Sequence, residues 1–361
     1  MSRTLVVASL ALINVVGRCW GGEPSPPAGG VDQPLPLAAG VRKAVERSTG
    51  YLAREGVKWK QKQQCASCHH IPFMVWALNE AHDHGYSIDD KALDEVMSWA
   101  LDEKKHTQVF PDLPLDTKHS ETDYLGPLLM ALGVGAVEQR TAAQESARQR
   151  LIAHALRQQA ADGSWNPNGV NGRPPVHSTK DVQTSLLFLA LSDPSTTSSP
   201  ADPWRAQRAS VIDWLSHNAP ADSHQGRIMR FLVNRRLEKP TDDSPPLLEW
   251  LLERQNGDGG WGQTRKMKSD AFATGLALYA LSGRQTPHVE GVVRRATTFL
   301  LESQLPDGGW PMASRHAEPP GPGPAKDLGP IKYIGTSWAT IGLVRTSPAL
   351  KSAGTRAVPE E

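Results

Sequence analysis

A seven-residue motif that occurs three times constrains the fold of this chain more than any other feature. Segments 159–165, 255–261 and 304–310 all follow the pattern Q-x-x-D-G-[GS]-W. The spacing of the copies corresponds to two periods and one period of about 48 residues, and periods of this size are typical of stacked supersecondary units. The sequence therefore predicts a fold built from repeats.

Each copy lies between two helical patterns of different character. The pattern before it is amphipathic, as in 287–303, whereas the pattern after it is apolar on all sides, as in 269–282. Each unit should therefore pair an outer helix with a buried inner helix. The predicted outer helices are 41–55, 90–103, 142–159, 203–218, 244–255 and 287–303. The predicted inner helices are 70–82, 121–134, 179–192, 224–236, 269–282 and 335–346.

Six such pairs predict an all-α fold, a single (α/α)6 toroid over residues 41–347 with a tail at 348–361. Closure into a ring buries both end units, whereas an open superhelix would need polar terminal repeats. The fourth inner helix is partly polar, because Arg227, Arg230, Arg235 and Arg236 interrupt its apolar residues.

The motif resembles that of the prenyltransferase and squalene-cyclase repeat superfamily. In that family an outer-helix aromatic residue precedes Gln and Gly-x-Trp, as do Trp250, Gln255, Gly259 and Trp261 here. The resemblance implies a structural role, in which the glutamine caps helix ends and the tryptophan packs nearby. The resemblance is specific for the fold and much less so for an activity.

The same resemblance argues against a standard squalene–hopene cyclase. Those enzymes use two toroids and an acidic D-x-D-D motif, whereas the nearest match here, Lys180-Asp181-Val182-Gln183, keeps one carboxylate. A lone Asp181 is a poor acid for an alkene. Prenyltransferase β-subunits are single toroids with zinc, but they need a partner subunit and a cytosolic substrate. An enzyme of this fold would be cyclase-like, prenyltransferase-like or a haem-dependent redox enzyme.

The inner helices also indicate a ligand. Their many small residues leave a central apolar space suited to an isoprenoid or another hydrophobic small molecule. The alternative is that bulky side chains fill this space. The candidates are Phe73, Trp76, Phe188, Phe272, Tyr279 and Trp338.

Several chemically active side chains should ring one opening, because all inner helices of a toroid run in the same direction. They are Cys68, His69, Asp123, Asp181 and Asp270. The aspartates can serve as helix N-caps. In the functional interpretation some of them face a ligand, and Asp181 and Asp123 are the candidate catalytic residues.

The motif Cys65-x-x-Cys68-His69 is the most specific chemical signal in the chain, and it resembles a c-type haem attachment motif. In that interpretation Cys65 and Cys68 bind haem through thioethers and His69 ligates the iron. A sixth ligand would come from elsewhere. Candidates are His119, His177, Met267 and Met312.

Two other interpretations of this motif remain open. The first is zinc, held by both thiolates, by His69 or His70, and by a further residue such as His119, Asp123 or His177. The second is a disulfide or a pair of free thiols. A non-catalytic binding or scaffold protein with a structural zinc or disulfide is therefore the alternative function.

The N-terminus predicts export. A basic start and a short apolar run indicate a signal peptide over 1–22, followed by a Pro/Gly-rich linker over 23–40. An uncleaved signal anchor is the alternative. No later segment is apolar enough to cross a bilayer, so we expect a periplasmic protein, with a redox partner if haem is present.

The charge balance excludes nucleic acid as an expected partner. The 361 residues include 39 Lys and Arg against 38 Asp and Glu, for a net charge of +1. Such a balance builds no strong positive field for a polyanion.

Overall fold

The computed structural model describes residues 35–63, 70–102, 121–135, 141–167, 175–177, 179–192, 203–237, 244–315 and 328–350. Pro34–Glu361 form one compact unit, and the architecture below concerns this unit alone. The predicted signal peptide and most of the predicted linker lie outside the described residues. So do Cys65, Cys68, His69 and His119, and the side chain of Asp123.

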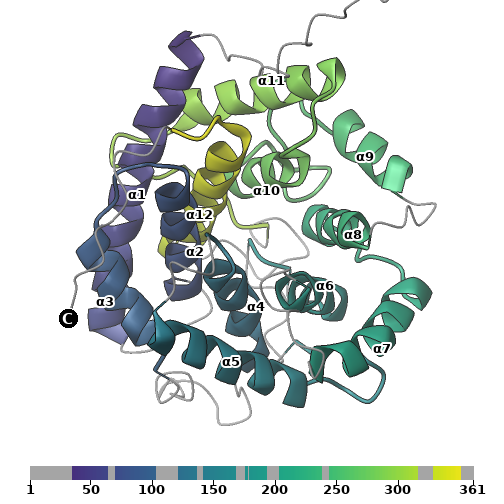
Figure 1. Ribbon diagram of the computed structural model, residues 1–361. Helices are drawn as coiled ribbons and strands as arrows, with labels where there is room; N and C mark the ends of the chain where they lie inside the picture. The colour runs from purple at the N-terminus through teal and green to yellow at the C-terminus, as the bar shows by residue number, and fades with distance from the viewer. Residues whose placement is uncertain are drawn as a thin grey trace, which may run out of the picture. The chain divides into compact units, whose positions relative to one another are not determined.

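Twelve helices in the described part of the chain alternate between two layers (Figure 1). The outer layer holds α1 (Leu35–Gln63), α3 (Asp90–Ala100), α5 (Ala142–Arg157), α7 (Pro203–His217), α9 (Ser244–Glu253) and α11 (Pro287–Ser303). The inner layer holds α2 (Ile71–Asp83), α4 (Glu121–Leu132), α6 (Lys180–Leu191), α8 (His224–Arg236), α10 (Ala271–Leu281) and α12 (Gly329–Thr346). Most bounds lie within three residues of the prediction, but α1 is longer at both ends and α12 begins earlier, with Pro330 in its first turn.

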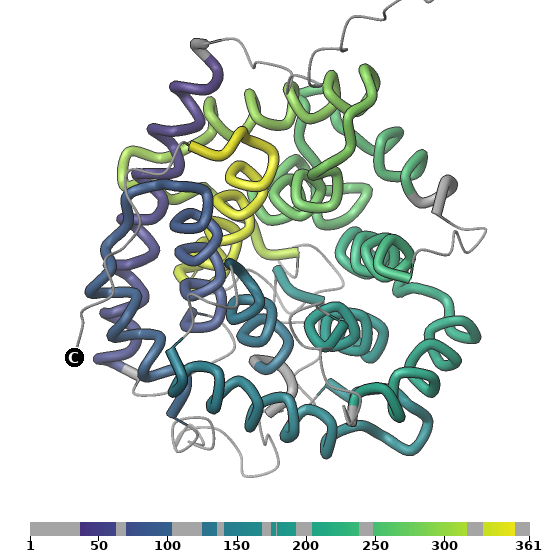
Figure 2. The backbone as a smooth tube through the Cα atoms, in the orientation of Figure 1, coloured from purple at the N-terminus to yellow at the C-terminus, as the bar shows by residue number. Residues whose placement is uncertain are grey.

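The inner helices close into a ring. Each of them contacts the next along the chain, and α12 returns to contact α2. In the outer layer α1 contacts both α11 and α3, so the first helix seals the junction with the last unit (Figure 2). The predicted α/α toroid is therefore confirmed.

Small residues allow the closest approach within the inner ring. A Cβ on Gly275 of α10 would overlap the backbone of Trp338 on α12, and a Cβ on Gly342 would meet the carbonyl of Gly275. Every residue of α6 from Asp181 to Leu191 is buried, as expected for a helix that is apolar on nearly all sides.

The repeated motif joins consecutive helices, as its resemblance implied. Each motif tryptophan donates its indole N–H to a carbonyl in the preceding outer helix, at Ala155, Leu251 and Leu300, over 2.7–2.9 Å. Its backbone N–H donates to a threonine hydroxyl on the following inner helix. These threonines are Thr184, Thr274 and Thr336, all fully buried.

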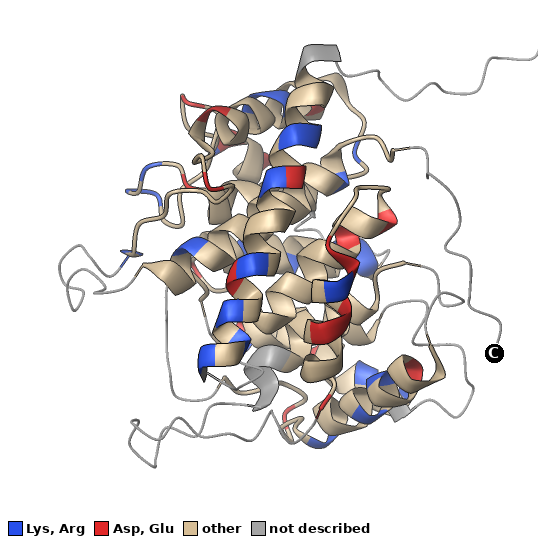
Figure 3. Cartoon of the chain, turned by 90° about the vertical axis from the view of Figure 1, so that its left-hand side faces the viewer, with Lys and Arg blue, Asp and Glu red and all other residues tan. Residues whose placement is uncertain are grey.

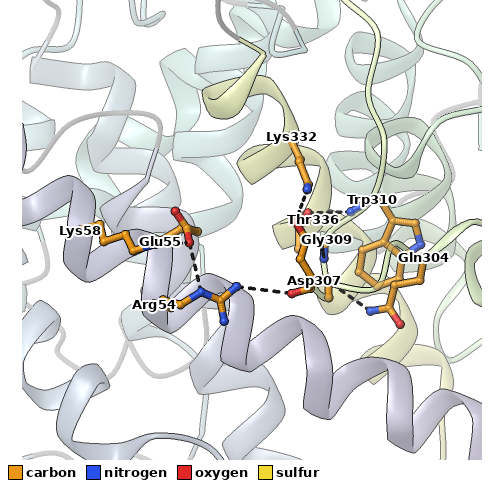
Figure 4. Close-up of polar contacts among 10 residues, drawn as sticks. Arg54, Glu55, Lys58, Gln304, Asp307, Gly309, Trp310, Lys332 and Thr336 are labelled. Carbon is orange, nitrogen blue, oxygen red and sulfur yellow. Dashed lines mark hydrogen bonds and ion pairs between the residues drawn. The ribbon is translucent and has the colours of Figure 1, made fainter.

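The motif glutamine extends this joint to the next outer helix. Gln304 Nε2 donates to the carbonyl of Gly308 in its own turn at 3.0 Å (Figure 4). It also donates to the carbonyl of Ala44 on α1 at 2.9 Å. Gly308 has a φ of +93°, and a Cβ there would overlap the carbonyl of Arg47. The third copy therefore fastens the end of the repeat array to α1 and completes the ring.

A second recurring joint was not predicted. The motif carboxylate Asp307 pairs at 2.6 Å with Lys332 of α12, whose ammonium lies 5.0 Å from the ring centre of Tyr51 on α1. Asp162, Lys180 and Trp214 repeat this arrangement, with distances of 2.6 and 5.6 Å. Asp222, Arg227 and Trp250 repeat it a third time. An acid, a base and an aromatic ring thus connect an inner helix to the next outer helix.

Candidate functional site

The end of the ring at which the inner helices begin is the candidate site, here called the entry end. The segments before α6, α8, α10 and α12 contact one another there. Arg315 donates to the carbonyls of Pro175 at 2.8 Å and Val176 at 2.9 Å. The backbone N–H of His177 donates to Gln225 Oε1 at 2.7 Å. These contacts join segments 140 and 48 residues apart in the sequence.

Asp181 joins two inner helices at the entry end. Its Oδ1 lies 2.5 Å from Nη2 of Arg230 on α8, and its Oδ2 accepts the backbone N–H of Ala221 at 3.0 Å. Burial raises the pKa of this carboxyl, and the Arg230 guanidinium counteracts that effect. The N-cap of α6 is Thr179, so the N-cap interpretation of Asp181 is wrong. Its catalytic role stays a prediction.

Asp270 is the N-cap of α10, as predicted. Its Oδ1 accepts the backbone N–H of Ala273 at 2.9 Å, and its Oδ2 accepts the amide of Gln263 at 2.9 Å. Gln263 also donates to the carbonyl of Ala313. Burial raises the pKa of Asp270 to about 6, because desolvation disfavours the charged form. This carboxyl therefore titrates close to neutral pH.

His70 anchors the chain directly after the Cys65–His69 motif. Its imidazole is buried between Trp59 of α1, with ring centres 3.9 Å apart and an interplanar angle of 7°, and Tyr333 of α12, at 4.1 Å and 32°. Both faces of the ring are covered, so stacking fixes its orientation, whereas the ring nitrogens, through which an imidazole binds a metal, lie at its edge. His70, the residue that follows the motif, is therefore held in place by two aromatic rings.

The other proposed ligands that the structure describes lie in segments of the entry end. His177 follows the two residues held by Arg315, and Met312 packs against Gly335 of α12. Within the described ranges no three residues among His, Cys, Asp and Glu are grouped as metal ligands. A haem or zinc site would therefore depend on residues 65–69, which lie outside those ranges.

Aromatic side chains pack against one another between α2, α10 and α12. Trp76 and Trp338 have ring centres 5.0 Å apart, and Tyr279 lies 5.8 Å from Trp76. Phe73 and Phe272 contact Trp338 at 6.2 and 6.4 Å. Four of these five rings are buried, so bulky side chains fill this sector of the ring.

Two buried polar residues were missed by the sequence analysis. Glu80 of α2 is fully buried, accepts the indole N–H of Trp76 at 3.0 Å, and binds Arg345 of α12 through both oxygens at 2.5 and 2.7 Å. His224 begins α8, where burial lowers its pKa to about 4. The sequence did offer a signal for Glu80, because an acidic residue within the otherwise apolar pattern of α2 indicates a buried charge that needs a partner.

Comparisons with known proteins agree with this architecture. Residues 217–359 match the squalene-hopene cyclase C-terminal domain family. A drimenyl diphosphate synthase from Streptomyces showdoensis is 41% identical over 63 residues, which are 18% of this chain and 12% of that protein. A copalyl diphosphate synthase from Streptomyces cyslabdanicus is 28% identical over 213 residues, 52% of this chain and 36% of that protein. The chain thus matches well under two thirds of either relative.

Solved structures show the same fold at low sequence identity. A variant of the type II terpene cyclase MstE from Scytonema, in complex with geranylgeranyl dihydroxybenzoate, has a TM-score of 0.54 and 14% identity, over 88% of this chain and all of that chain. A polysaccharide lyase reaches a TM-score of 0.56 at 9% identity, over 85% of this chain and 96% of that chain.

The closed ring of helix pairs defines the class of fold, an α/α toroid. The predicted resemblance to the prenyltransferase and squalene-cyclase repeat superfamily is confirmed by the match of residues 217–359 and by the shared architecture. The resemblance of Cys65-x-x-Cys68-His69 to a haem attachment motif stays a prediction.

Proposed function

We propose that this chain is an exported terpene-cyclase-like toroid that binds or acts on a hydrophobic, isoprenoid-like molecule and carries a covalent haem on Cys65 and Cys68. In this proposal His69 is the iron ligand. Haem bound there would supply one-electron redox chemistry, with a redox protein as partner. The part of the chain from residue 23 onward would be periplasmic, since the signal-peptide pattern covers residues 1–22. No helix among the described residues is long and apolar enough to span a membrane.

The position of the motif carries the haem proposal. Residues 64–69 connect the end of α1 at Gln63 to the start of α2 at Ile71, and α2 belongs to the inner ring. His70, the next residue, is held between Trp59 and Tyr333. A group bonded to the two cysteines would therefore be tethered at the entry end. The same position would suit zinc, which is the alternative centre.

The isoprenoid part of the proposal is supported by the comparisons. Two relatives are named as synthases of drimenyl and copalyl diphosphate, and the MstE complex contains geranylgeranyl dihydroxybenzoate. We do not assign the activity of those proteins to this chain, because its candidate catalytic carboxylate, Asp181, forms an ion pair with Arg230. The proposal is therefore one of binding, with Asp181 and Asp123 as the candidate catalytic residues.

Expression with export and haem-maturation machinery tests the haem. We expect a Soret band and haem that stays on the chain in a denaturing gel. Cys65→Ala/Cys68→Ala should abolish covalent retention, because it removes both thioethers, whereas His82→Ala, which removes an exposed histidine of α2, should not. A chain with no Soret band and with bound zinc would establish the alternative centre. A chain with neither would leave a disulfide or free thiols.

Tryptophan fluorescence tests the isoprenoid ligand. Titration with geranylgeraniol should change the emission in a saturable way, and a straight-chain alcohol with the same number of carbons serves as the control for non-specific partitioning. An equal response to both alcohols would contradict an isoprenoid site.

A non-catalytic binding protein is the second candidate. The packed rings of Trp76, Trp338 and Phe272 favour it, because they leave less room for a substrate between α2, α10 and α12. A chain without haem that shows no saturable response to geranylgeraniol would identify this function, with the toroid serving as an interaction surface.

A further inference from the structure

The turn of the second motif copy contains a reactive dipeptide that the turns of the other two copies lack. In each copy the backbone N–H of the motif glycine donates to the carbonyl of the first turn residue over 2.9–3.0 Å, so the three turns share one backbone conformation. The first two turn residues are Ala160-Ala161 in the first copy, Asn256-Gly257 in the second and Leu305-Pro306 in the third. The turn itself therefore does not require an asparagine at this position.

The side chain of Asn256 connects the turn to the start of α10. Its Nδ2 donates to Ser269 Oγ at 2.9 Å, and that hydroxyl donates to Asp258 Oδ1 at 2.6 Å. Ser269 directly precedes Asp270, the N-cap of α10. This three-residue link therefore belongs to the entry end of the ring.

The charges around this turn also differ from those in the other copies. In the first and third copies the motif carboxylate pairs with a lysine of the following inner helix over 2.6 Å. In the second copy the equivalent position, four residues before Thr274, is Asp270, and the motif carboxylate Asp258 accepts from the neutral hydroxyl of Ser269. A negative charge introduced at Asn256 would therefore meet Asp258 without the lysine that the other two copies provide.

An asparagine that precedes a glycine can lose its side-chain amide in water. The backbone nitrogen of the glycine attacks the asparagine Cγ, the bond from Cγ to Nδ2 breaks, and ammonia leaves a cyclic imide. Water then opens the imide to aspartate or isoaspartate. Glycine has no side chain that would obstruct the attack. Gly257 is exposed, and a Cβ on it would have no atom within 4 Å.

The bond between Asn256 and Ser269 opposes this reaction. The attack requires the Asn256 side chain to rotate until its Cγ approaches the nitrogen of Gly257. The backbone cannot move to make this approach, because the N–H of Asn256 donates to the carbonyl of Gly260 and its carbonyl accepts from Gly259, both at 2.9 Å. The side chain must therefore leave Ser269 before it reacts.

We propose that Asn256 is a site of spontaneous deamidation and that the Ser269 hydroxyl sets its rate by holding the side-chain amide. The reaction consumes water, releases ammonia and needs neither haem nor an isoprenoid, so it goes beyond the proposed function and does not depend on it. The product places a second carboxylate beside the hydroxyl that Asp258 already uses, next to the N-cap Asp270. Isoaspartate also lengthens the main chain within the turn. Both products loosen the start of α10.

Peptide mass spectrometry of the full chain during incubation at mildly alkaline pH tests the site. We expect the mass increase that replaces –NH2 by –OH, located at Asn256. Ser269→Ala should raise the rate about fivefold, since one hydrogen bond no longer restrains the amide. Ser269→Thr keeps a hydroxyl and should react at nearly the rate of the unmodified chain. Ser216→Ala, which removes an exposed serine hydroxyl from α7, is the matched control and should change nothing.

The same digests supply internal references, because Asn168 and Asn171 also precede glycines and should react at the same rates in all variants. An Asn256 that stays intact in the folded chain while it deamidates in urea would overturn the proposal. So would a rate that Ser269→Ala leaves unchanged.

Two substitutions at the reactive residue test the consequence for the entry end. Asn256→Ala restores the residue of the first copy, so it should remove the reaction and keep the turn. Asn256→Asp should make amide hydrogen exchange in residues 256–273 faster than in Asn256→Ala, because its carboxylate lies beside that of Asp258. Equal exchange in the two variants would overturn the expected loosening of α10.

Discussion

At the scale of single residues, two buried titratable groups near the start of α10 act on stability in opposite directions. Burial raises the pKa of Asp270 from 3.8 to about 6, so the folded chain binds this proton more tightly than the unfolded chain. Its contribution is present below about pH 4 and is lost as the pH rises through about 6. His224, whose pKa falls to about 4, contributes stability that is gained as the pH rises from about 4 to 6.5.

Asp270→Asn isolates the first of these effects, since asparagine is also a good N-cap and carries no charge. We expect the variant to gain stability relative to the unmodified chain as the pH rises from about 4 to 6, by up to about 3 kcal/mol. Urea denaturation at several pH values measures this, and the contribution of His224 cancels in the difference. A difference that does not change with pH would contradict the raised pKa.

At the scale of elements, the three copies of the motif allow a comparison within one chain. Gln304 and Gln255 each donate to two carbonyls, one in their own turn and one on the next outer helix. Among the described residues, Gln159 donates only to the carbonyl of Gly163. The second bond, to Ala44 or Val292, is the one that joins outer helices.

Replacement of each glutamine by alanine should therefore have unequal effects. We expect Gln304→Ala to lower the free energy of unfolding by about 2 kcal/mol and Gln159→Ala by about 1 kcal/mol, since each lost bond to a carbonyl contributes about 1 kcal/mol and the exposed bond that Gln304 accepts from Arg47 adds little. Urea denaturation of both variants measures the difference. Equal losses would mean that the bond to α1 contributes nothing.

The elements were predictable from the sequence because periodicity is a local property. The amphipathic pattern of 287–303 predicted the bounds of α11, and the apolar pattern of 269–282 predicted those of α10, both to within two residues. The partners of Asp181 and His70 were not predictable from local patterns. Arg230 and Tyr333 lie far from them in the sequence and contact them only in the folded toroid. The acid–base–aromatic joint was missed for the same reason, since its three members lie on three different segments.

At the scale of the whole molecule, the distribution of charged side chains on one described side agrees with the near-neutral net charge of +1. On the side of the ring that carries α1 and α3, basic and acidic side chains are interspersed (Figure 3). Arg42 and Glu46 form one such pair on α1.

The closure of the ring gives the last prediction. Glu80 of α2 and Arg345 of α12 form an ion pair across the junction between the first and last inner helices, 265 residues apart in the sequence. Glu80 is fully buried, so Glu80→Gln leaves the Arg345 guanidinium without its counter-ion in a partly buried position. We expect a loss of about 3 kcal/mol in the free energy of unfolding.

The double variant Glu80→Gln/Arg345→Met supplies the control for this prediction, because it removes both charges. It should be more stable than Glu80→Gln alone, since the unpaired charge is gone. Hydrogen exchange should show that Glu80→Gln increases opening in α1, α2 and α12 before the helices on the far side of the ring. Uniform loosening of all helices would instead mean that the ring unfolds as one unit and that this junction is not its weak point.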